Sequence, residues 1–104
     1  MSVKYDKGKV QPRLIIESMP KAIMCVAEVG TFGAEKYSPD GWKHVHDGYF
    51  RYTDAMYRHL LQEHQGHLID QESQLYHAAH AAWNALARLE LLIEKLEQHD
   101  EVGF

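Results

Sequence analysis

The sequence predicts an all-α protein, a bundle of three main helices that is completed by oligomerisation. Two observations predict this class: apolar residues recur at helical spacing in three segments, and no segment alternates apolar and polar residues as a half-buried strand would. The three helices are expected at about 20–37, 49–65 and 71–99. A chain of 104 residues has room for one domain, so we assign residues 1–104 to a single α-helical domain.

The N-terminal third is expected to contain an arm, a helix and a turn. Residues 1–12 are polar and predict an extended arm. The first helix follows, with Ser18 as a possible cap and Pro20 in the first turn, where its missing N–H costs nothing. The segment SPDGW at 38–42 combines proline, aspartate and glycine and predicts a turn.

The second and third helices carry the clearest apolar patterns. The second is supported by Met56, Leu60 and Leu61, and Gly66 is a plausible stop. The third has Asp70 as a candidate N-cap and a leucine-rich stripe along one face. At ~1.5 Å per residue this helix is about 42 Å long, too long for two short neighbours to bury. The part of this helix that the other two helices cannot cover predicts a homo-oligomer, either a dimer or a tetramer.

Composition limits the classes of partner. A net charge of −4 provides no general attraction to nucleic acid or to an anionic membrane. The chain has neither an apolar run long enough to span a membrane nor a signal peptide, so we expect the cytoplasm of a bacterial or phage-infected cell. Cys25 is the single cysteine, and its apolar neighbours favour a small buried side chain over a nucleophile.

Polar residues interrupt the apolar faces of the second and third helices. In HAAHAAWNA, the residues His77, His80 and Asn84 share one helix face, because positions i, i+3 and i+7 stack along a helix. On the second helix, i, i+4 spacing pairs His59 with Glu63. The same spacing pairs Asp54 with Arg58, while Asp70 and Glu72 stand at the start of the third helix. If the two helices pack antiparallel, these groups converge on one polar site.

That mixture of groups suits a divalent cation and a polyphosphate. Mg²⁺ prefers oxygen ligands, whereas imidazole suits Mn²⁺, Zn²⁺ or Fe²⁺ or serves as an acid and base. Structural alternatives are open for each pair. The alternatives are helix caps for Asp70 and Ser73, a surface ion pair for Asp54 and Arg58, and inert interface histidines for His77 and His80.

Four segments, KYDKGKVQPRL, VGTFGAEKYSPDGW, YRHLL and GHLIDQESQLYHAAHAAWNAL, together resemble one family. They are similar to the phage and prophage proteins described as dATP/dGTP diphosphohydrolase-like, which are related to the MazG-type all-α nucleotide pyrophosphohydrolases. The resemblance covers about residues 4–92. It implies hydrolysis of a purine (deoxy)nucleoside triphosphate to the monophosphate and pyrophosphate. It also implies Mg²⁺ or Mn²⁺ and a helical oligomer with sites between packed helices.

The resemblance also suggests a role for each polar residue. By analogy, the metal ligands are Asp54, Asp70 and Glu72, and the catalytic residues are His59, Glu63, His77 and His80. The substrate-binding residues are Lys36, Arg58 and Asn84, together with Lys4, Lys9 and Arg13 of the arm region. Trp42 is expected either to stack on the base or to anchor the turn.

The chain departs from the pattern of the wider pyrophosphohydrolase group. That group uses paired glutamates on one helix and a glutamate–aspartate pair on the next, where this chain has the rows His59–Glu63 and His77–His80. His67 and Gly41 also stand where an acidic residue and an asparagine are expected. Two other interpretations are therefore open. One is a non-catalytic phage accessory protein that binds a nucleotide or a host partner, and the other is a phosphohydrolase that uses the histidines as metal ligands.

Overall fold

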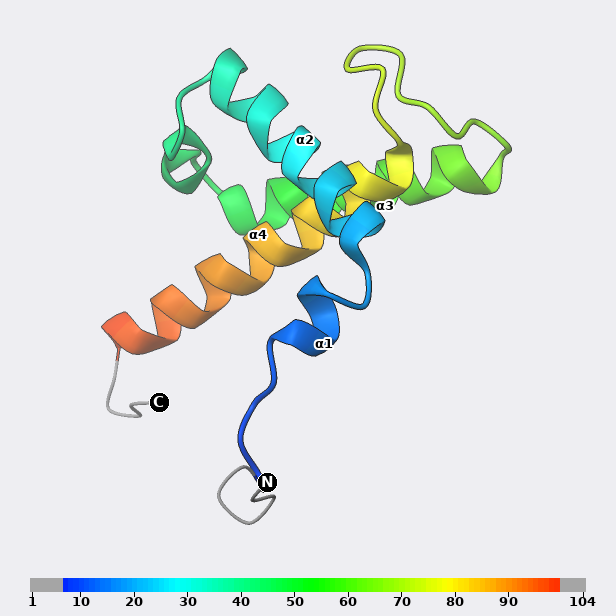
Figure 1. Ribbon diagram of the computed structural model, residues 1–104. Coiled ribbons are helices and arrows are strands. Elements are labelled where there is room, and N and C mark those ends of the chain that lie inside the picture. The colour runs from blue at the N-terminus through cyan, green and yellow to red at the C-terminus, as the bar shows by residue number, and fades with distance from the viewer. Residues whose placement is uncertain (1–6, 100–104) are drawn as a thin grey trace.

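The computed structural model describes residues 7–99. Within this range, four α-helices follow one another: α1 (Arg13–Ile16), α2 (Pro20–Lys36), α3 (Gly48–His64) and α4 (His77–Gln98), with the short 3-10 helix η1 (Gly41–His44) between α2 and α3 (Figure 1). Residues 7–99 form no strand, only an isolated antiparallel bridge between Ile69 and Tyr76. The prediction of an all-α fold is therefore confirmed.

Helices α3 and α4 pack antiparallel, and α2 crosses them (Figure 1). The direction follows from contacts at both ends. Gly48 at the start of α3 meets Leu91 late in α4, whereas His59 late in α3 meets His77 at the start of α4. Gly30 places α2 against Trp83 of α4. The convergence of polar faces, which required this antiparallel arrangement, is therefore possible.

Small side chains occupy the centre of the packed helices. The buried apolar residues are Val29, Ala79, Ala81 and Ala87. Alanines on the buried face of α4 let the neighbouring backbones approach closely, which explains why an alanine-rich segment forms the middle of the fold. The price of this arrangement is a small core, because an alanine buries little apolar area.

The end of α3 confirms the predicted role of Gly66. Gly66 adopts φ 97°, a left-handed conformation that glycine accepts without steric cost. Its N–H donates to the carbonyl of Glu63 at 2.9 Å, and the N–H of His67 donates to Gln62 at 3.0 Å. These two bonds satisfy carbonyls that the last turn leaves without helical partners. At the start of α2, Pro20 occupies the first turn as predicted, but the N-cap residue is Met19 and not Ser18.

The predicted start of the third helix is wrong. The helix begins at His77 and not at Gln71, so residues 71–76 form a loop and Asp70 is not an N-cap. Two local features prevent a helix there. The carboxylate of Asp70 accepts bonds from the N–H and hydroxyl of Ser73, and Gln74 adopts φ 63°. Such side-chain to backbone bonds compete with helical bonds, and left-handed backbone ends a right-handed helix. The rod is accordingly about 33 Å long, at ~1.5 Å per residue.

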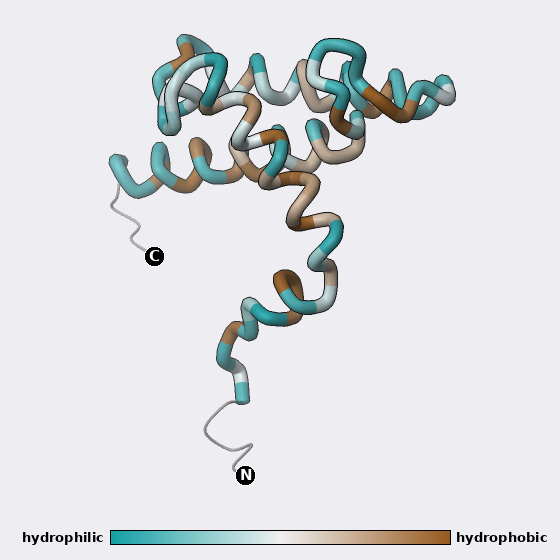
Figure 2. The backbone as a smooth tube through the Cα atoms, turned by 45° about the horizontal axis from the view of Figure 1, so that its top comes forward, coloured by the Kyte–Doolittle hydropathy of each residue, from teal (hydrophilic) through white to brown (hydrophobic). Residues whose placement is uncertain are grey.

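The N-terminal segment lies apart from the packed helices. Figure 2 shows residues 7–12 and α1 extending away from the α2–α4 packing, with apolar positions along α1. Residues 7–12 are exposed and precede α1, while the first half of the predicted arm, residues 1–6 with Lys4, lies outside the described residues. The short α1 was not predicted. Within residues 7–99, none of the helices has the length and apolar content that crossing a membrane requires.

Candidate functional site

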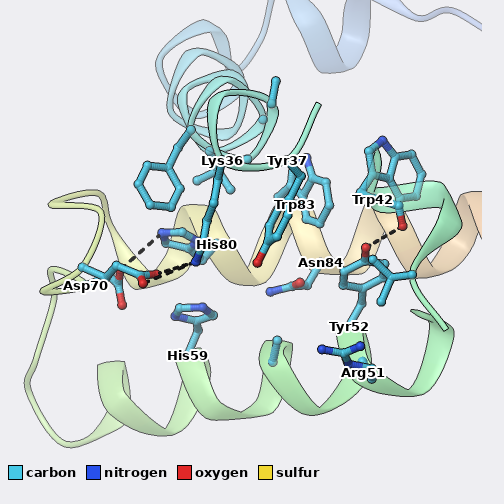
Figure 3. A pocket seen from close by; sticks show the side chains of 18 of the residues that line it. Lys36, Tyr37, Trp42, Arg51, Tyr52, His59, Asp70, His80, Trp83 and Asn84 are labelled. Atoms are coloured by element: carbon cyan, nitrogen blue, oxygen red, sulfur yellow. Dashed lines mark hydrogen bonds and ion pairs between the residues drawn. The ribbon is translucent and has the colours of Figure 1, made fainter. Parts of the chain in front are cut away.

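A pocket of about 420 Å³ lies between α2, α3 and α4, and we call it the interhelical pocket (Figure 3). Its volume falls in the range of small-molecule sites, about 300–1,000 Å³. Charged, aromatic and amide side chains line it. The polar and aromatic members are Phe32, Lys36, Tyr37, Ser38, Trp42, Arg51, Tyr52, Asp54, Arg58, His59, Asp70, Glu72, His80, Trp83 and Asn84.

One face of α3 supplies the floor. Arg51, Asp54 and Arg58 all line the pocket and are spaced i, i+3 and i+7, which places them in one row along the helix. The charged groups of Asp54 and Arg58 are more than 4.0 Å apart, so these two residues do not form the surface ion pair that was the alternative interpretation. Arg51 was missed from the sequence, although its seven-residue spacing from Arg58 on an otherwise identified polar face was a usable indication.

The end of α2 brings a cation above this floor. The ammonium of Lys36 lies 3.4 Å from Glu72, which belongs to the loop before α4. The hydrogen bond to Glu72 raises the pKa of Lys36 above its ordinary value. Both side chains are substantially exposed, at 43% and 67%, so either can reorient toward a ligand. Figure 3 shows Lys36 descending from α2 toward Asp70 and the two histidines.

Aromatic rings close the opposite end of the pocket. Trp42 makes edge-to-face contacts with Trp83, at 5.5 Å between ring centroids, and with Tyr52, at 6.2 Å. The hydroxyl of Tyr52 donates to the backbone carbonyl of Trp42, and burial raises the pKa of that hydroxyl. These contacts make Trp42 the anchor of η1, as one of the two alternatives proposed. Trp42 also lines the pocket, so part of its side chain can contact a ligand there.

Asn84 is the most enclosed polar group of the pocket. It is 5% exposed, and in Figure 3 its amide lies among the lining side chains between α3 and α4. No hydrogen bond from the described part of the chain reaches this amide. None of the described residues has a sealed side-chain N or O atom without a partner, so the amide of Asn84 keeps contact with the open space of the pocket. Asn84 is therefore well placed to fix the orientation of a polar ligand.

A hydrogen-bond chain joins the loop to α4. The hydroxyl of Ser73 donates to Asp70 Oδ2 at 2.8 Å, and the N–H of Ser73 donates to the same oxygen at 2.9 Å. Because its hydroxyl proton is used in this way, Ser73 Oγ accepts from His80 Nε2 at 2.6 Å. His80 is then the Nε2–H tautomer, and its Nδ1 carries a lone pair. Asp70 is thus the acceptor at the centre of a polar network, not a helix cap.

This network shifts the pKa values of Asp70 and His80. Burial alone would raise the pKa of Asp70, but the bonds from Ser73 and the nearby imidazoles lower it below its ordinary value. Burial lowers the pKa of His80, and the charge of Asp70, 3.7 Å from Nε2, partly offsets this. Asp70 is consequently a carboxylate at neutral pH, and His80 is a neutral imidazole.

His59 and His77 meet at the side of the pocket. Their Nδ1 atoms are 2.8 Å apart, and the His59 ring stacks on His80 with centroids 4.4 Å apart. Burial, followed by the neighbouring His80, lowers the pKa of His59 to about 4. His77 is only 6% exposed. The partner of His59 is therefore His77, and not the predicted Glu63.

A second cavity of about 490 Å³ opens beside this pair, and we call it the histidine pocket. Its lining is mostly polar and comes from α3, the loop and the first residue of α4: Arg58, His59, Gln62, His67, Ile69, Asp70, Gln71 and His77. His59, Asp70 and Arg58 therefore line both cavities. The two cavities meet at these shared side chains.

The structure gathers most of the residues predicted from the sequence, but not all. Nine line the interhelical pocket: Lys36, Trp42, Asp54, Arg58, His59, Asp70, Glu72, His80 and Asn84. His77 lines the histidine pocket. Glu63, Lys9 and Arg13 line neither cavity. His77 and His80 both contact the ring of His59 across the packing of α3 and α4, so the alternative of interface histidines stays open for them.

The carboxylates predicted as metal ligands do not form a cluster. Within residues 7–99, the group of ligating side chains whose atoms all lie within 4.8 Å of one another consists of His59, Asp70 and His77. Of the predicted set Asp54, Asp70 and Glu72, only Asp70 belongs to it. Glu72 instead pairs with Lys36.

Comparison with known proteins identifies the family. A family model described as dATP/dGTP diphosphohydrolase, N-terminal, matches residues 2–101. The chain belongs to this family. The protein named dATP/dGTP diphosphohydrolase of Salmonella phage PMBT28 is 36% identical over 80 residues, which are 77% of this chain and 26% of that protein. The chain of this family member thus spans about a quarter of the length of its curated relative. No solved structure matches it.

Proposed function

We propose that the chain hydrolyses a purine (deoxy)nucleoside triphosphate to the monophosphate and pyrophosphate in the interhelical pocket. The observation that carries the proposal is the lining of that pocket. Three cationic side chains, Lys36, Arg51 and Arg58, share it with carboxylates and imidazoles in a chain of the dATP/dGTP diphosphohydrolase family. The phage relative, which is named dATP/dGTP diphosphohydrolase, supports the same substrate class.

The cations and the amide account for substrate binding. Arginine presents a planar fork that matches phosphate oxygens, and Arg51 and Arg58, which both line the pocket, would engage the phosphate groups there. Lys36 would exchange its contact with Glu72 for a phosphate oxygen. Trp42 and Asn84 lie on the same pocket and would contact the base or sugar.

A divalent cation, Mg²⁺ or Mn²⁺, fits the donor set of this pocket. Asp54, Asp70 and Glu72 line the pocket without forming one cluster, so one or two of them would hold the ion together with water and the phosphate oxygens of the substrate. When bound, such an ion neutralises phosphate charge and lowers the pKa of water. His80 is the side chain best arranged to accept the proton of the attacking water, because Ser73 holds its Nε2–H and leaves Nδ1 with a lone pair. Asp70 would stabilise the imidazolium that results.

The proposal also includes a homo-oligomer, as expected from the sequence. The radius of gyration is 16.4 Å, whereas a compact domain of this length has about 13 Å. Large apolar side chains remain exposed on both ends of the fold. They include Leu14, Ile15 and Ile16 on α1 and Leu86, Leu89, Leu92 and Leu96 on α4. Apolar surface on this scale is typical of chains that bury it against a partner, and light scattering after gel filtration measures the number of copies.

Pyrophosphate release tests the activity. The protein is incubated with dATP, dGTP, dCTP or dTTP and either Mg²⁺ or Mn²⁺, and we expect product with the purine nucleotides. Lys36→Met should lower kcat/KM about tenfold, the effect of losing roughly 1.4 kcal/mol in the transition state. Lys43→Met is the matched control, because Lys43 also pairs with a glutamate, at 3.3 Å, but does not line the pocket.

Two outcomes separate the alternatives. Absence of pyrophosphate with all four nucleotides, from protein that is folded and assembled, would overturn the hydrolase proposal. If calorimetry then shows nucleotide binding that Lys36→Met weakens, the pocket belongs to a non-catalytic nucleotide-binding protein.

A further inference from the structure

We infer that His59, Asp70 and His77 bind a divalent transition-metal ion at the base of the histidine pocket. The ligating atoms come from α3, the loop and α4 and lie within 4.8 Å of one another. The inference goes beyond the proposed hydrolysis, since the site is complete whether or not a nucleotide is turned over. It also differs from a set of carboxylate ligands, because two of its three donors are imidazole nitrogens.

The two imidazoles face each other with the same ring atom. Both Nδ1 atoms point into a contact of 2.8 Å, and a lone pair on each would repel unless a proton or a cation lies between them. Two donors at about 2.1 Å from one ion are about 3.0 Å apart at the right angle of an octahedral site and about 3.4 Å apart at a tetrahedral angle. The observed distance is therefore close to that of adjacent ligands, and a small ring movement admits an ion.

The third ligand is held in place by its surroundings. Both hydrogen bonds from Ser73 end at Oδ2 of Asp70, and His80 donates a hydrogen bond to the Oγ of Ser73. No hydrogen bond from residues 7–99 reaches Oδ1, which leaves this oxygen for an ion. Metal-binding carboxylates are commonly fixed by such a set of outer hydrogen bonds.

The backbone keeps Asp70 and His77 at a constant separation. The N–H of Asp70 donates to Leu75 at 2.8 Å, and the N–H of His77 donates to Leu68 at 2.9 Å. These bonds close the segment 68–77 into a narrow loop across the Ile69–Tyr76 bridge. A ligand pair fixed by backbone bonds loses little conformational entropy when it binds an ion.

Donor chemistry selects the class of ion. Two imidazoles and one carboxylate suit Mn²⁺, Fe²⁺, Co²⁺ or Zn²⁺, whereas Mg²⁺ and Ca²⁺ prefer oxygen donors throughout. Three protein ligands leave positions for water or a substrate oxygen, and the adjoining cavity of about 490 Å³ gives room for them. Arg58 also lines that cavity and can hold an anion next to the ion.

Direct metal binding tests the site independently of catalysis. Metal-free full chain is titrated with Co²⁺, Zn²⁺, Mn²⁺ and Mg²⁺, and bound metal is measured by elemental analysis, calorimetry and the visible absorption of Co²⁺. We expect one Co²⁺ or Zn²⁺ per chain, with Mg²⁺ bound at least tenfold more weakly. His59→Gln and Asp70→Asn should each weaken Co²⁺ binding tenfold or more. His64→Gln should leave it unchanged, since His64 is an exposed residue of the same helix that lines neither cavity.

Nitrogen coupling in the electron paramagnetic resonance spectrum of bound Mn²⁺ or Cu²⁺ reports imidazole ligands in the unaltered protein, so the test does not depend on the variants folding. Absence of stoichiometric transition-metal binding would overturn the inference, as would binding that survives both substitutions in folded variants. Pyrophosphate release with Mg²⁺ alone in a protein that binds no transition metal would refute this site and leave the hydrolase proposal intact. Metal binding without pyrophosphate release would do the reverse.

Discussion

Ser73→Ala tests the hydrogen-bond chain that organises the site. The Ser73 hydroxyl donates to Asp70 and accepts from His80 and, at 3.2 Å, from the N–H of Leu75. Alanine keeps the backbone N–H that also binds Asp70, so the substitution removes the hydroxyl alone. The volume change is one oxygen atom, and no large cavity forms.

The expected cost follows from which groups lose partners. A hydrogen bond to a charged group contributes about 1.5–3 kcal/mol, and a buried donor without a partner costs about 1–3 kcal/mol. The side chains of His80 and Asp70 are 12% and 19% exposed, so water replaces part of the lost bonding. We therefore expect the free energy of unfolding to fall by about 2 kcal/mol, which for a domain of this size lowers Tm by about 8–16 °C.

Urea and thermal denaturation at one fixed protein concentration measure this change. Thr31→Ala is the control, because its exposed hydroxyl bonds only to the Ala27 carbonyl of its own helix, and we expect a change below about 0.5 kcal/mol. A double-mutant cycle with His80→Phe, which keeps a ring but removes Nε2, should give a coupling energy of about 1 kcal/mol. A Ser73→Ala protein as stable as the parent, or a coupling energy near zero, would refute the proposed network.

Three further predictions concern other parts of the fold. Tyr52→Phe should cost about 1 kcal/mol at pH 8, because it removes the hydroxyl bond to Trp42. Burial raises the pKa of Tyr52, so the contribution of its hydroxyl to stability is complete below about pH 10 and is lost as the pH rises through the folded-state pKa. The parent should therefore lose more stability than Tyr52→Phe between pH 9 and 11, as urea titrations at each pH would measure. Gly30→Ala should stabilise the protein by about 0.5–1 kcal/mol, because the added Cβ meets Trp83 at an ordinary 3.5 Å and alanine favours a helix; a lower Tm would contradict this. Leu89→Glu, on a side chain that is 51% exposed, should reduce the oligomer measured by light scattering while helicity in circular dichroism is retained; an unchanged oligomer would exclude this face of α4 from the interface.

Local patterns in the sequence were sufficient to predict the helices but not all of their ends. The apolar spacing of residues 49–65 and the glycine that follows are local properties, so α3 and its C-terminal cap were predicted closely. The start of α4 was misplaced, because the sequence around Asp70 and Ser73 is compatible both with a helix cap and with a hydrogen-bonded loop. The loop network forms because His80, seven residues along the chain, makes a hydrogen bond to the hydroxyl of Ser73.

By itself, the amino-acid order determined the helical class and which polar side chains share one face of a helix, since both depend on spacing along one helix. Only the tertiary structure decided which of these side chains meet. His59 pairs with His77, eighteen residues away, and not with Glu63 on its own helix, because the crossing of antiparallel helices sets the distances between their facing rows. Periodicity fixes the direction of a side chain around its helix axis, whereas the partner it reaches depends on how two helices dock, and that is settled by packing contacts distant in sequence.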